Sequence, residues 1–164
     1  MLRDPGLIPL SHQHQHGLAL AVLIDRGLKG DPPPEKAVEL ARKVAAMADA
    51  ELLAHFRIEE ETLFPTVRGF LEAEDVVDQL IEQHREMESL IESIARSSGP
   101  AQSALLKQFG ELLSRHIRIE ERQLFEEIQA KLPPAQMGKL GRQIEEQVQK
   151  VCPAGDVLPW EDAP

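Results

Sequence analysis

Two segments of the chain carry the same pattern of histidine and glutamate. Residues 55–64 read HFRIEEETLF and residues 116–125 read HIRIEERQLF, and seven of the ten positions are identical. In an α-helix, side chains four residues apart lie about one turn apart on the same face. The spacing therefore predicts that His55 points the same way as Glu59, and His116 the same way as Glu120.

Leucines flank both pairs and indicate where they point. Leu52 and Leu63 flank the first pair, while Leu112, Leu113 and Leu124 flank the second, so both pairs lie on or beside the face that packs into the core. A carboxylate or imidazole buried among leucines costs several kcal/mol unless something pairs it. A metal dication is a suitable partner, because imidazole binds iron, zinc, copper or nickel and a carboxylate can bridge two cations.

A fainter repeat adds two histidines. Gln13-His14 and Gln83-His84 are each followed by apolar residues at helical spacing. The chain therefore resembles two copies of a helical hairpin, each with two histidines and one inward carboxylate. A single His-x-x-x-Glu is usually a surface pair. Two copies, with a histidine on each intervening helix, instead favour a dinuclear metal site on a pseudo-two-fold axis at the centre of a helical bundle.

The glutamates next to the repeated pairs are expected to face solvent. The first glutamate of each run, Glu59 or Glu120, is predicted to point inward, and Glu60, Glu61 and Glu121 outward. Replacing Glu59 or Glu120 by alanine should then release metal and lower the melting temperature, because metal binding adds to folding stability. The same change at Glu60 or Glu121 should have little effect.

The elements that must position these residues are helices. Ala, Leu, Glu, Gln, Lys and Arg fill the long segments, and clusters of Pro and Gly separate them. We predict helices at about 11–28, 35–64, 73–96, 100–131 and 134–151. Ser11 is the expected N-cap of the first. Pro65 is expected to end the second helix or to kink it towards Leu71.

The helix lengths predict an all-α fold. Four long helices with short connections favour an antiparallel up-down-up-down four-helix bundle over about residues 10–131. The additional short C-terminal helix, at about 134–151, would pack outside the bundle, and residues 152–164 would form an extended tail that Trp160 could pin to it. At 164 residues the whole chain, 1–164, fits a single domain.

These motifs resemble those of the hemerythrin-like, or HHE cation-binding, proteins. Residues 55–65 and 116–125 look like the second- and fourth-helix motifs of that family, LSHQHQHGL at 10–18 looks like the first, and EQHREM at 82–87 is similar to the third. The resemblance covers about residues 10–131. It implies a non-haem di-iron centre, with two iron ions joined by two carboxylates and an oxo or hydroxo bridge. The terminal ligands it implies are His14, His55, His84 and His116, and the bridges are Glu59 and Glu120.

Two departures from the family pattern leave alternatives open. Oxygen-carrying members have a second histidine one turn after the third-helix ligand, where this chain has Glu88. Water, Glu88 or an N-terminal histidine could take that place. The first helix also offers His12 and His16. The Gln-His repeat favours His14, but the apolar residues on the side of His16 make it the alternative ligand. Other divalent metals also suit these residue types.

The function implied is binding or sensing of dioxygen or a related small ligand such as nitric oxide, or storage of iron. Four apolar residues are candidate walls of the ligand cavity: Leu63, Phe64, Leu124 and Phe125. The alternative is a di-iron enzyme that reduces oxygen or peroxide species or repairs iron centres. No flavin, haem or nicotinamide motif appears as an electron donor, which favours a binding module over an enzyme. A third reading is a metal-free network of histidine and glutamate that only organises the core.

Charge and composition exclude several partners. The net charge is −10 and the pI about 5.1, which disfavours binding to nucleic acid or anionic lipid. No apolar run reaches the roughly 18 residues of a membrane span, and the start of the chain lacks the apolar core of a secretory signal. A single cysteine, Cys152, suits a reducing compartment, so a cytoplasmic location is expected. No protein partner is indicated.

Overall fold

The computed structural model of the chain describes residues 2–72, 75–151, 158 and 160. Every regular element within these residues is helical. The first rod consists of a short 3-10 helix, η1 (Pro5–Leu7), and helix α1 (Ile8–Gly27). The expected N-cap Ser11 therefore lies inside the helix, which begins earlier because Asp4 caps η1 through the backbone N–H of Gly6 and Pro9 occupies the first turn of α1.

The second rod is a continuous run of helical segments, two of which are π turns, η2 and η3. In order these are α2 (Pro34–Met47), η2 (Ala48–Leu52), α3 (Leu53–Ile58), η3 (Glu59–Leu63), α4 (Phe64–Val67) and the 3-10 turn η4 (Arg68–Phe70). Pro65 does not end the rod, which continues to Phe70, in agreement with the alternative of a continuation towards Leu71. The π turn before it starts a new α segment, so the proline lies in the first turn, where its missing N–H costs no helical bond.

The remaining rods follow the expected boundaries closely. They are α5 (Asp75–Arg96), then α6 (Gly99–Ile119) with the π turn η5 (Glu120–Leu124) and α7 (Phe125–Lys131), and finally α8 (Pro134–Val151). Ala73, where the third helix was predicted to begin, lies outside the described residues, as does most of the tail. Trp160 of the tail is buried and belongs to the hydrophobic core, as expected.

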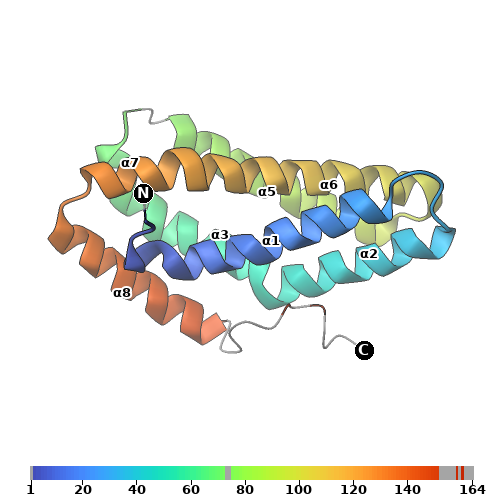
Figure 1. Cartoon of the computed structure of the whole chain (residues 1–164), viewed down its shortest axis with the longest axis horizontal. Helices are drawn as coiled ribbons and strands as arrows, with labels where there is room; N and C mark the ends of the chain where they lie inside the picture. The colour runs from blue at the N-terminus through green and yellow to red at the C-terminus, as the bar shows by residue number, and fades with distance from the viewer. Residues whose placement is uncertain (1, 73–74, 152–157, 159, 161–164) are drawn as a thin grey trace.

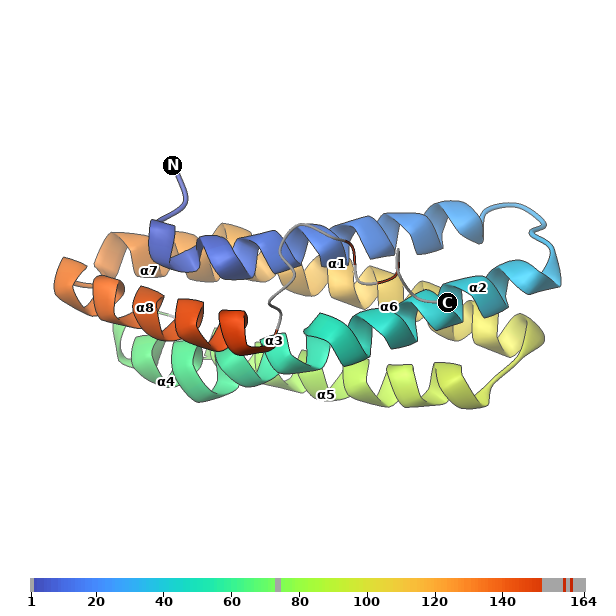
Figure 2. The ribbon, with the colours of Figure 1, turned by 90° about the horizontal axis from the view of Figure 1, so that it is seen from below.

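The long rods lie side by side along the length of the molecule (Figure 1). Helix α6 packs against both α1 and α5, and α2 packs against α1 and α6. Helix α8 covers one end, beside α1 and the α3–α4 part of the second rod, as Figure 2 also shows. None of the described helices is both long and apolar enough to traverse a bilayer.

The core divides into two hydrophobic clusters along the rods. One cluster contains Leu20, Met87 and Phe109, and the other contains Leu10 and Leu80. On α1, α5 and the α6–α7 rod, the buried histidines and glutamates of the repeats come between residues of the two clusters. The helices therefore place a layer of polar side chains across the middle of an apolar core.

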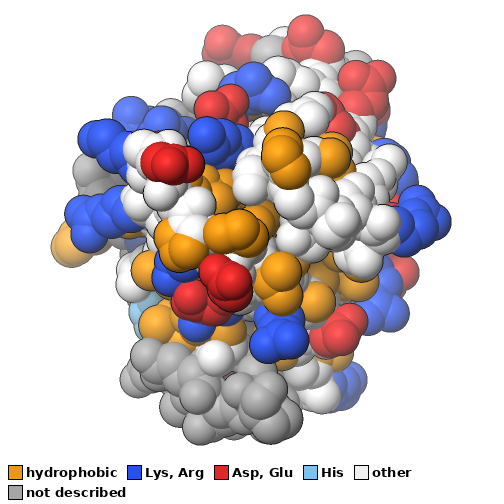
Figure 3. All heavy atoms as spheres, turned by 90° about the vertical axis from the view of Figure 1, so that its right-hand side faces the viewer, with side chains coloured by type: hydrophobic (Ala, Val, Ile, Leu, Met, Phe, Trp, Pro, Cys, Tyr) orange, Lys and Arg blue, Asp and Glu red, His pale blue; other side chains and the backbone are white. Residues whose placement is uncertain are grey.

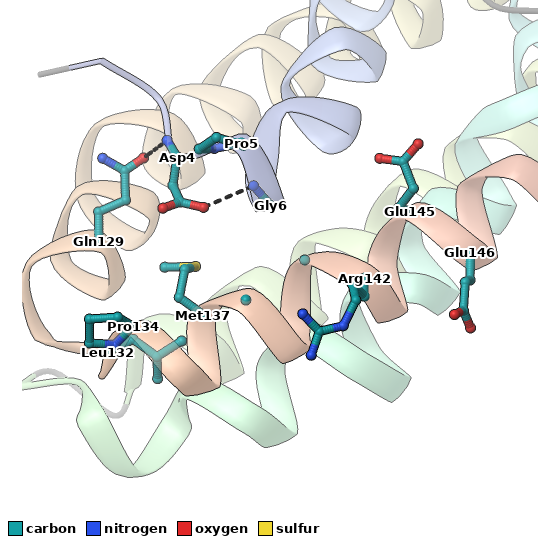
Figure 4. A pocket seen from close by; sticks show the side chains of 12 residues that line it. Asp4, Pro5, Gly6, Gln129, Leu132, Pro134, Met137, Arg142, Glu145 and Glu146 are labelled. Atoms are coloured by element: carbon teal, nitrogen blue, oxygen red, sulfur yellow. Dashed lines mark hydrogen bonds between the residues drawn. The ribbon is translucent and has the colours of Figure 1, made fainter.

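Helix α8 is fixed to the N-terminal segment by a backbone contact. A Cβ placed on Gly141 would lie 2.5 Å from the Cα of Gly6, so only glycines allow this approach. Next to the contact, Asp4 accepts a hydrogen bond from the backbone N–H of Gly6 and donates its own backbone N–H to Gln129, as Figure 4 shows. A surface groove of about 700 Å³ follows this junction.

Candidate metal centre

Six buried side chains meet in the polar layer. They form two groups of four that share two glutamates: one group is His14, His55, Glu59 and Glu120, and the other is Glu59, His84, His116 and Glu120. Within each group, one nitrogen or oxygen of every residue lies within 4.8 Å of the others. Each group receives side chains from different rods, so the tertiary fold rather than one helix brings the group together.

The glutamates contact histidines of both groups. Glu59 Oε1 lies 2.9 Å from His55 Nε2, while its Oε2 lies 3.3 Å from His84 Nε2. Glu120 Oε2 lies 3.0 Å from His14 Nε2 and 3.4 Å from His116 Nε2. Each carboxylate therefore lies between two pairs of imidazoles, as a carboxylate that bridges two cations must.

The outer nitrogen of every histidine has a hydrogen-bond acceptor. His55 Nδ1 donates to Gln13 Oε1 at 2.8 Å, and His116 Nδ1 donates to Gln83 Oε1 at 2.9 Å. The other two Nδ1 atoms donate to carboxylates, His14 to Glu121 at 2.7 Å and His84 to Glu60 at 2.8 Å. Because Nδ1 carries the proton, the Nε2 lone pair of a neutral ring points into the centre.

This arrangement is unfavourable without a cation. The Nε2 atoms of His14 and His55 lie 3.1 Å apart, and those of His84 and His116 lie 3.2 Å apart. Two unprotonated Nε2 atoms at that distance repel each other. All four carboxylate oxygens of Glu59 and Glu120 are also buried without a hydrogen-bond donor. Converging lone pairs and orphaned carboxylate oxygens fit a pair of metal ions with nitrogen and oxygen ligands.

The pKa values of the metal-free side chains reflect the same crowding. Burial by itself would lower the pKa of His14, but contacts with Glu120, Glu121 and Glu59 raise it well above its usual value. Burial would likewise raise the pKa of Glu59, but the charge of His55 and the close approach of the His14 and His84 rings hold it well below its usual range. Protons on His14 and His84 therefore partly balance the buried carboxylates when no metal does.

The structure corrects the prediction for Glu60 and Glu121. Both were expected to face solvent, yet each is only partly exposed and accepts the hydrogen bond of a site histidine. The π turns η3 and η5 begin at Glu59 and Glu120. A π turn has more residues per turn than an α-helix, so consecutive side chains differ less in direction and the second glutamate also reaches the site. Glu61 is exposed, as predicted.

An arginine lies outside each of these glutamates. Arg3, from the segment before η1, pairs with Glu121, which also accepts a hydrogen bond from Ser11 Oγ at 2.7 Å. Arg85 pairs with Glu60. Each half of the centre thus has a chain from arginine to glutamate to histidine, and the two chains extend the internal symmetry beyond the repeated sequence.

Aromatic rings cover the histidines. Phe56 stacks on His84 with ring centroids 4.0 Å apart, and Phe125 stacks on His14 at 5.5 Å. Phe64 also stacks on His84, at 5.9 Å. Of the predicted cavity walls, Phe64 and Phe125 therefore touch the site, while Leu63 and Leu124 are buried in the second hydrophobic cluster.

The two alternative ligands lie outside the cluster. His16 Nδ1 contacts Glu51 at 3.0 Å, and Glu88 is partly exposed and pairs with Arg85 at 3.0 Å. The structure thus brings His14 to the centre along with the other five predicted residues. Sequence reasoning did not single out Glu51, a buried carboxylate one turn before His55, although that spacing was a usable signal.

Comparison with known proteins finds a family whose description, cation binding, is consistent with this cluster of histidines and glutamates. A family model described as the hemerythrin HHE cation binding domain matches residues 9–128. A DNA nickase of Nostoc sp. (strain PCC 7120) is 34% identical over 88 residues, which are 52% of this chain and 25% of the nickase. The chain therefore spans about a quarter of that relative. No solved structure matches the chain.

Proposed function

Because the chain belongs to the hemerythrin HHE cation-binding domain family, we propose that it is a non-haem di-iron protein that binds or senses dioxygen or a related small ligand such as nitric oxide, or stores iron. One observation carries the proposal. Two groups of histidines share two buried glutamates whose oxygens lack hydrogen-bond donors. Each group provides nitrogen and oxygen ligands for one ion, and the shared carboxylates would join the two ions.

The roles of the residues follow from their contacts. His14 and His55 would hold one ion, His84 and His116 the other, and Glu59 and Glu120 would bridge them, with an oxo or hydroxo group completing the bridge. When bound here, each iron ion would coordinate a small ligand and could donate one electron to it.

The surrounding side chains hold the ligands in place and keep water out. The Gln13, Gln83, Glu60 and Glu121 oxygens fix the ring orientation and tautomer of the four histidines. The two hydrophobic clusters on either side of the polar layer exclude bulk water. A centre enclosed in this way favours small, neutral ligands over large substrates.

The proposal extends to architecture and surroundings. We take the rods as an antiparallel up-down-up-down four-helix bundle, supported by the packing of α6 on α1 and α5, in a protein of the cytoplasm. Nicking of DNA is not part of it, because the chain spans a quarter of the nickase and has a net charge of −10. Figure 3 shows one end of the molecule, where acidic and basic side chains are interspersed and do not form a single basic surface.

Reconstitution with iron tests the proposal. Protein loaded with ferrous iron without air and then exposed to it should hold two iron ions per chain and absorb in the near ultraviolet, as oxo-bridged ferric pairs do. Glu59→Ala should lose both ions, whereas Glu61→Ala, at an exposed position of the same π turn, should keep them. Absence of iron uptake, or a spectrum like that of zinc-loaded protein, would refute the di-iron assignment.

Ligand titration then separates binding from catalysis. Addition of dioxygen or nitric oxide to the ferrous protein should give a stable adduct spectrum. The enzyme alternative instead requires turnover of peroxide or oxygen in the presence of a reductant. Sustained turnover without a stable adduct would favour the di-iron enzyme.

A further inference from the structure

The two halves of the centre take their outer arginines from different parts of the chain. Arg85 directly follows His84 on α5 and so belongs to the internal repeat. In the other copy, the residue after His14 is Gln15. That copy receives Arg3 instead, from the segment before η1, which lies outside the repeat. The N-terminal segment therefore supplies a cation that the repeated sequence lacks in this copy.

The side chain of Arg3 is held at several points on the neighbouring rod. It pairs with the carboxylate of Glu121 and donates to the backbone oxygen of that residue at 2.9 Å. It also donates to Gln129 Oε1 at 3.1 Å, and the same oxygen accepts the backbone N–H of Asp4 at 2.9 Å. Contacts with both η5 and α7 therefore fix the position of the guanidinium.

Arg3 is also better shielded from water than Arg85. Its side chain is 22% exposed, whereas that of Arg85 is 54% exposed. Arg85 in addition divides its contacts between Glu60 and Glu88. Water screens an exposed charge and weakens its effect on neighbouring groups. The two arginines therefore do not affect the two halves of the centre equally.

Glu121 uses its two oxygens for different partners. Its Oε1 accepts hydrogen bonds from His14 Nδ1 and Ser11 Oγ, both at 2.7 Å, while its Oε2 pairs with Arg3. The contact with Arg3 therefore keeps the carboxylate facing the histidine. Arg3 Cζ also lies 5.1 Å from the ring centroid of Phe125, and that ring stacks on His14. Arg3 thus contacts two groups that themselves contact His14.

A positive charge at this position favours the reduced form of a nearby metal ion. A carboxylate hydrogen-bonded to a ligand histidine makes the imidazole a stronger electron donor. Arg3 offsets part of the charge of that carboxylate and so limits the donation. The charge of Arg3 also repels a ferric ion more than a ferrous ion. Both effects act in the same direction and stabilise ferrous relative to ferric iron.

We propose that Arg3 is a positioning residue that acts on His14 through Glu121. It makes the ion held by His14 and His55 easier to reduce than the ion held by the other two histidines. The N-terminal segment therefore makes the two ion sites unequal, although the repeat makes their ligands alike. This inference rests on the proposed di-iron function and specifies the redox properties of the same centre.

The midpoint potential of the diferric protein tests the inference, measured by titration with dithionite, which supplies the electrons, in the presence of redox mediators. Arg3→Met removes the charge but keeps a long side chain. It should lower the equilibrium constant for the first one-electron reduction about tenfold, which is a fall of about 59 mV. Arg3→Lys restores the charge and should recover most of the loss. Arg85→Met, in the other half, should change the first potential by less.

Arg122→Met is the matched control for net charge, because Arg122 is exposed in the same π turn as Glu121. It should leave the potential unchanged. Iron content and melting temperature, measured on every variant, separate damage to the fold from a change in potential. Arg3→Gln also lacks the charge but can still donate hydrogen bonds, so it gives the same comparison should Arg3→Met lose iron.

Two results would overturn the inference and leave the di-iron function standing. The first is an unchanged potential in Arg3→Met at full iron content, which would mean that Arg3 only fastens the N-terminal segment. The second is an equal shift in Arg3→Met and in either Arg85→Met or Arg122→Met. An unaltered protein that takes up no iron would overturn both the inference and the proposed function.

Discussion

At the scale of residues, the hydrogen bonds that orient the histidines should affect metal retention. Glu60→Gln and Glu121→Gln keep the size of the side chain but weaken the bonds to His84 and His14. Loss of such outer contacts typically lowers metal affinity about 10- to 100-fold. We expect a lower midpoint in a chelator titration for both variants. Glu61→Gln serves as the control, and if it behaved like the other two, surface charge would explain the effect.

The acid–base properties of the same residues predict a dependence on pH. Contacts with glutamates raise the pKa of His14 and His84 despite burial. A histidine whose pKa is higher in the folded than in the unfolded protein stabilises the metal-free fold. This stabilisation is complete below the pKa of the unfolded state, about 6.5, and is lost as the pH rises through the pKa of the folded state. The stability of metal-free protein should therefore decline above neutral pH.

Metal binding should show the opposite trend. A metal ion must displace the protons from these imidazoles, so binding should release protons and strengthen as pH rises. Titration calorimetry in two buffers of different ionisation enthalpy measures the protons released. A metal affinity that does not vary between pH 6 and 8 would contradict the raised pKa values.

At this scale, the sequence was sufficient to predict which residues meet at the centre but not which glutamates form hydrogen bonds to its histidines. The i, i+4 spacing was sufficient to predict that His55 points the same way as Glu59 and His116 the same way as Glu120, because helical geometry alone fixes the direction of side chains four residues apart. Their role as ligands stays a prediction. Glu60 could not be assigned in the same way, because its direction depends on the π turn η3, which the i, i+4 spacing does not reveal.

At the scale of elements, the contact between α8 and the N-terminal segment should be essential for packing. In Gly141→Ala the new Cβ would meet the backbone of Gly6 at 2.5 Å, so α8 must move. Overpacking of this kind costs about 1–3 kcal/mol, against a gain of about 1 kcal/mol in helix propensity.

Gly138→Ala is the matched control on the same helix. Its Cβ would meet only the end of the Arg142 side chain, at 3.7 Å, so alanine should be neutral or stabilising there. Thermal unfolding should therefore give a lower melting temperature for Gly141→Ala than for Gly138→Ala. Equal melting temperatures would mean that the N-terminal segment moves aside at no cost.

The helix boundaries illustrate what local sequence can and cannot specify. Helix α8 lies where the prolines and the apolar spacing predicted it, since those signals are local. The second rod does not end at Pro65, because the π turn η3 stops directly before a new α segment and that proline lies in its first turn. The predicted N-cap Ser11 instead donates its hydroxyl to Glu121, which lies 110 residues away in the sequence on a neighbouring rod.

At the scale of the whole molecule, the polar layer is where the fold depends on its metal. The two hydrophobic clusters consist of apolar side chains, which bind no ion, but the six side chains between them leave carboxylate oxygens without donors. Buried charges without full compensation destabilise a fold by several kcal/mol. The metal-free molecule should therefore be weakest at its centre and not at its ends.

Removal of metal should reveal this weakness in two measurements. Chelator-treated protein should melt at a lower temperature, because binding free energy adds to the free energy of unfolding, and backbone amides of η3 and η5 should exchange with deuterium faster than those of α8. Returned iron should reverse both changes. Glu59→Ala should already melt at the lower temperature and respond little to chelator. If chelation instead accelerated exchange uniformly along the chain, the centre would stabilise the fold globally, and the two clusters would not be stable without it.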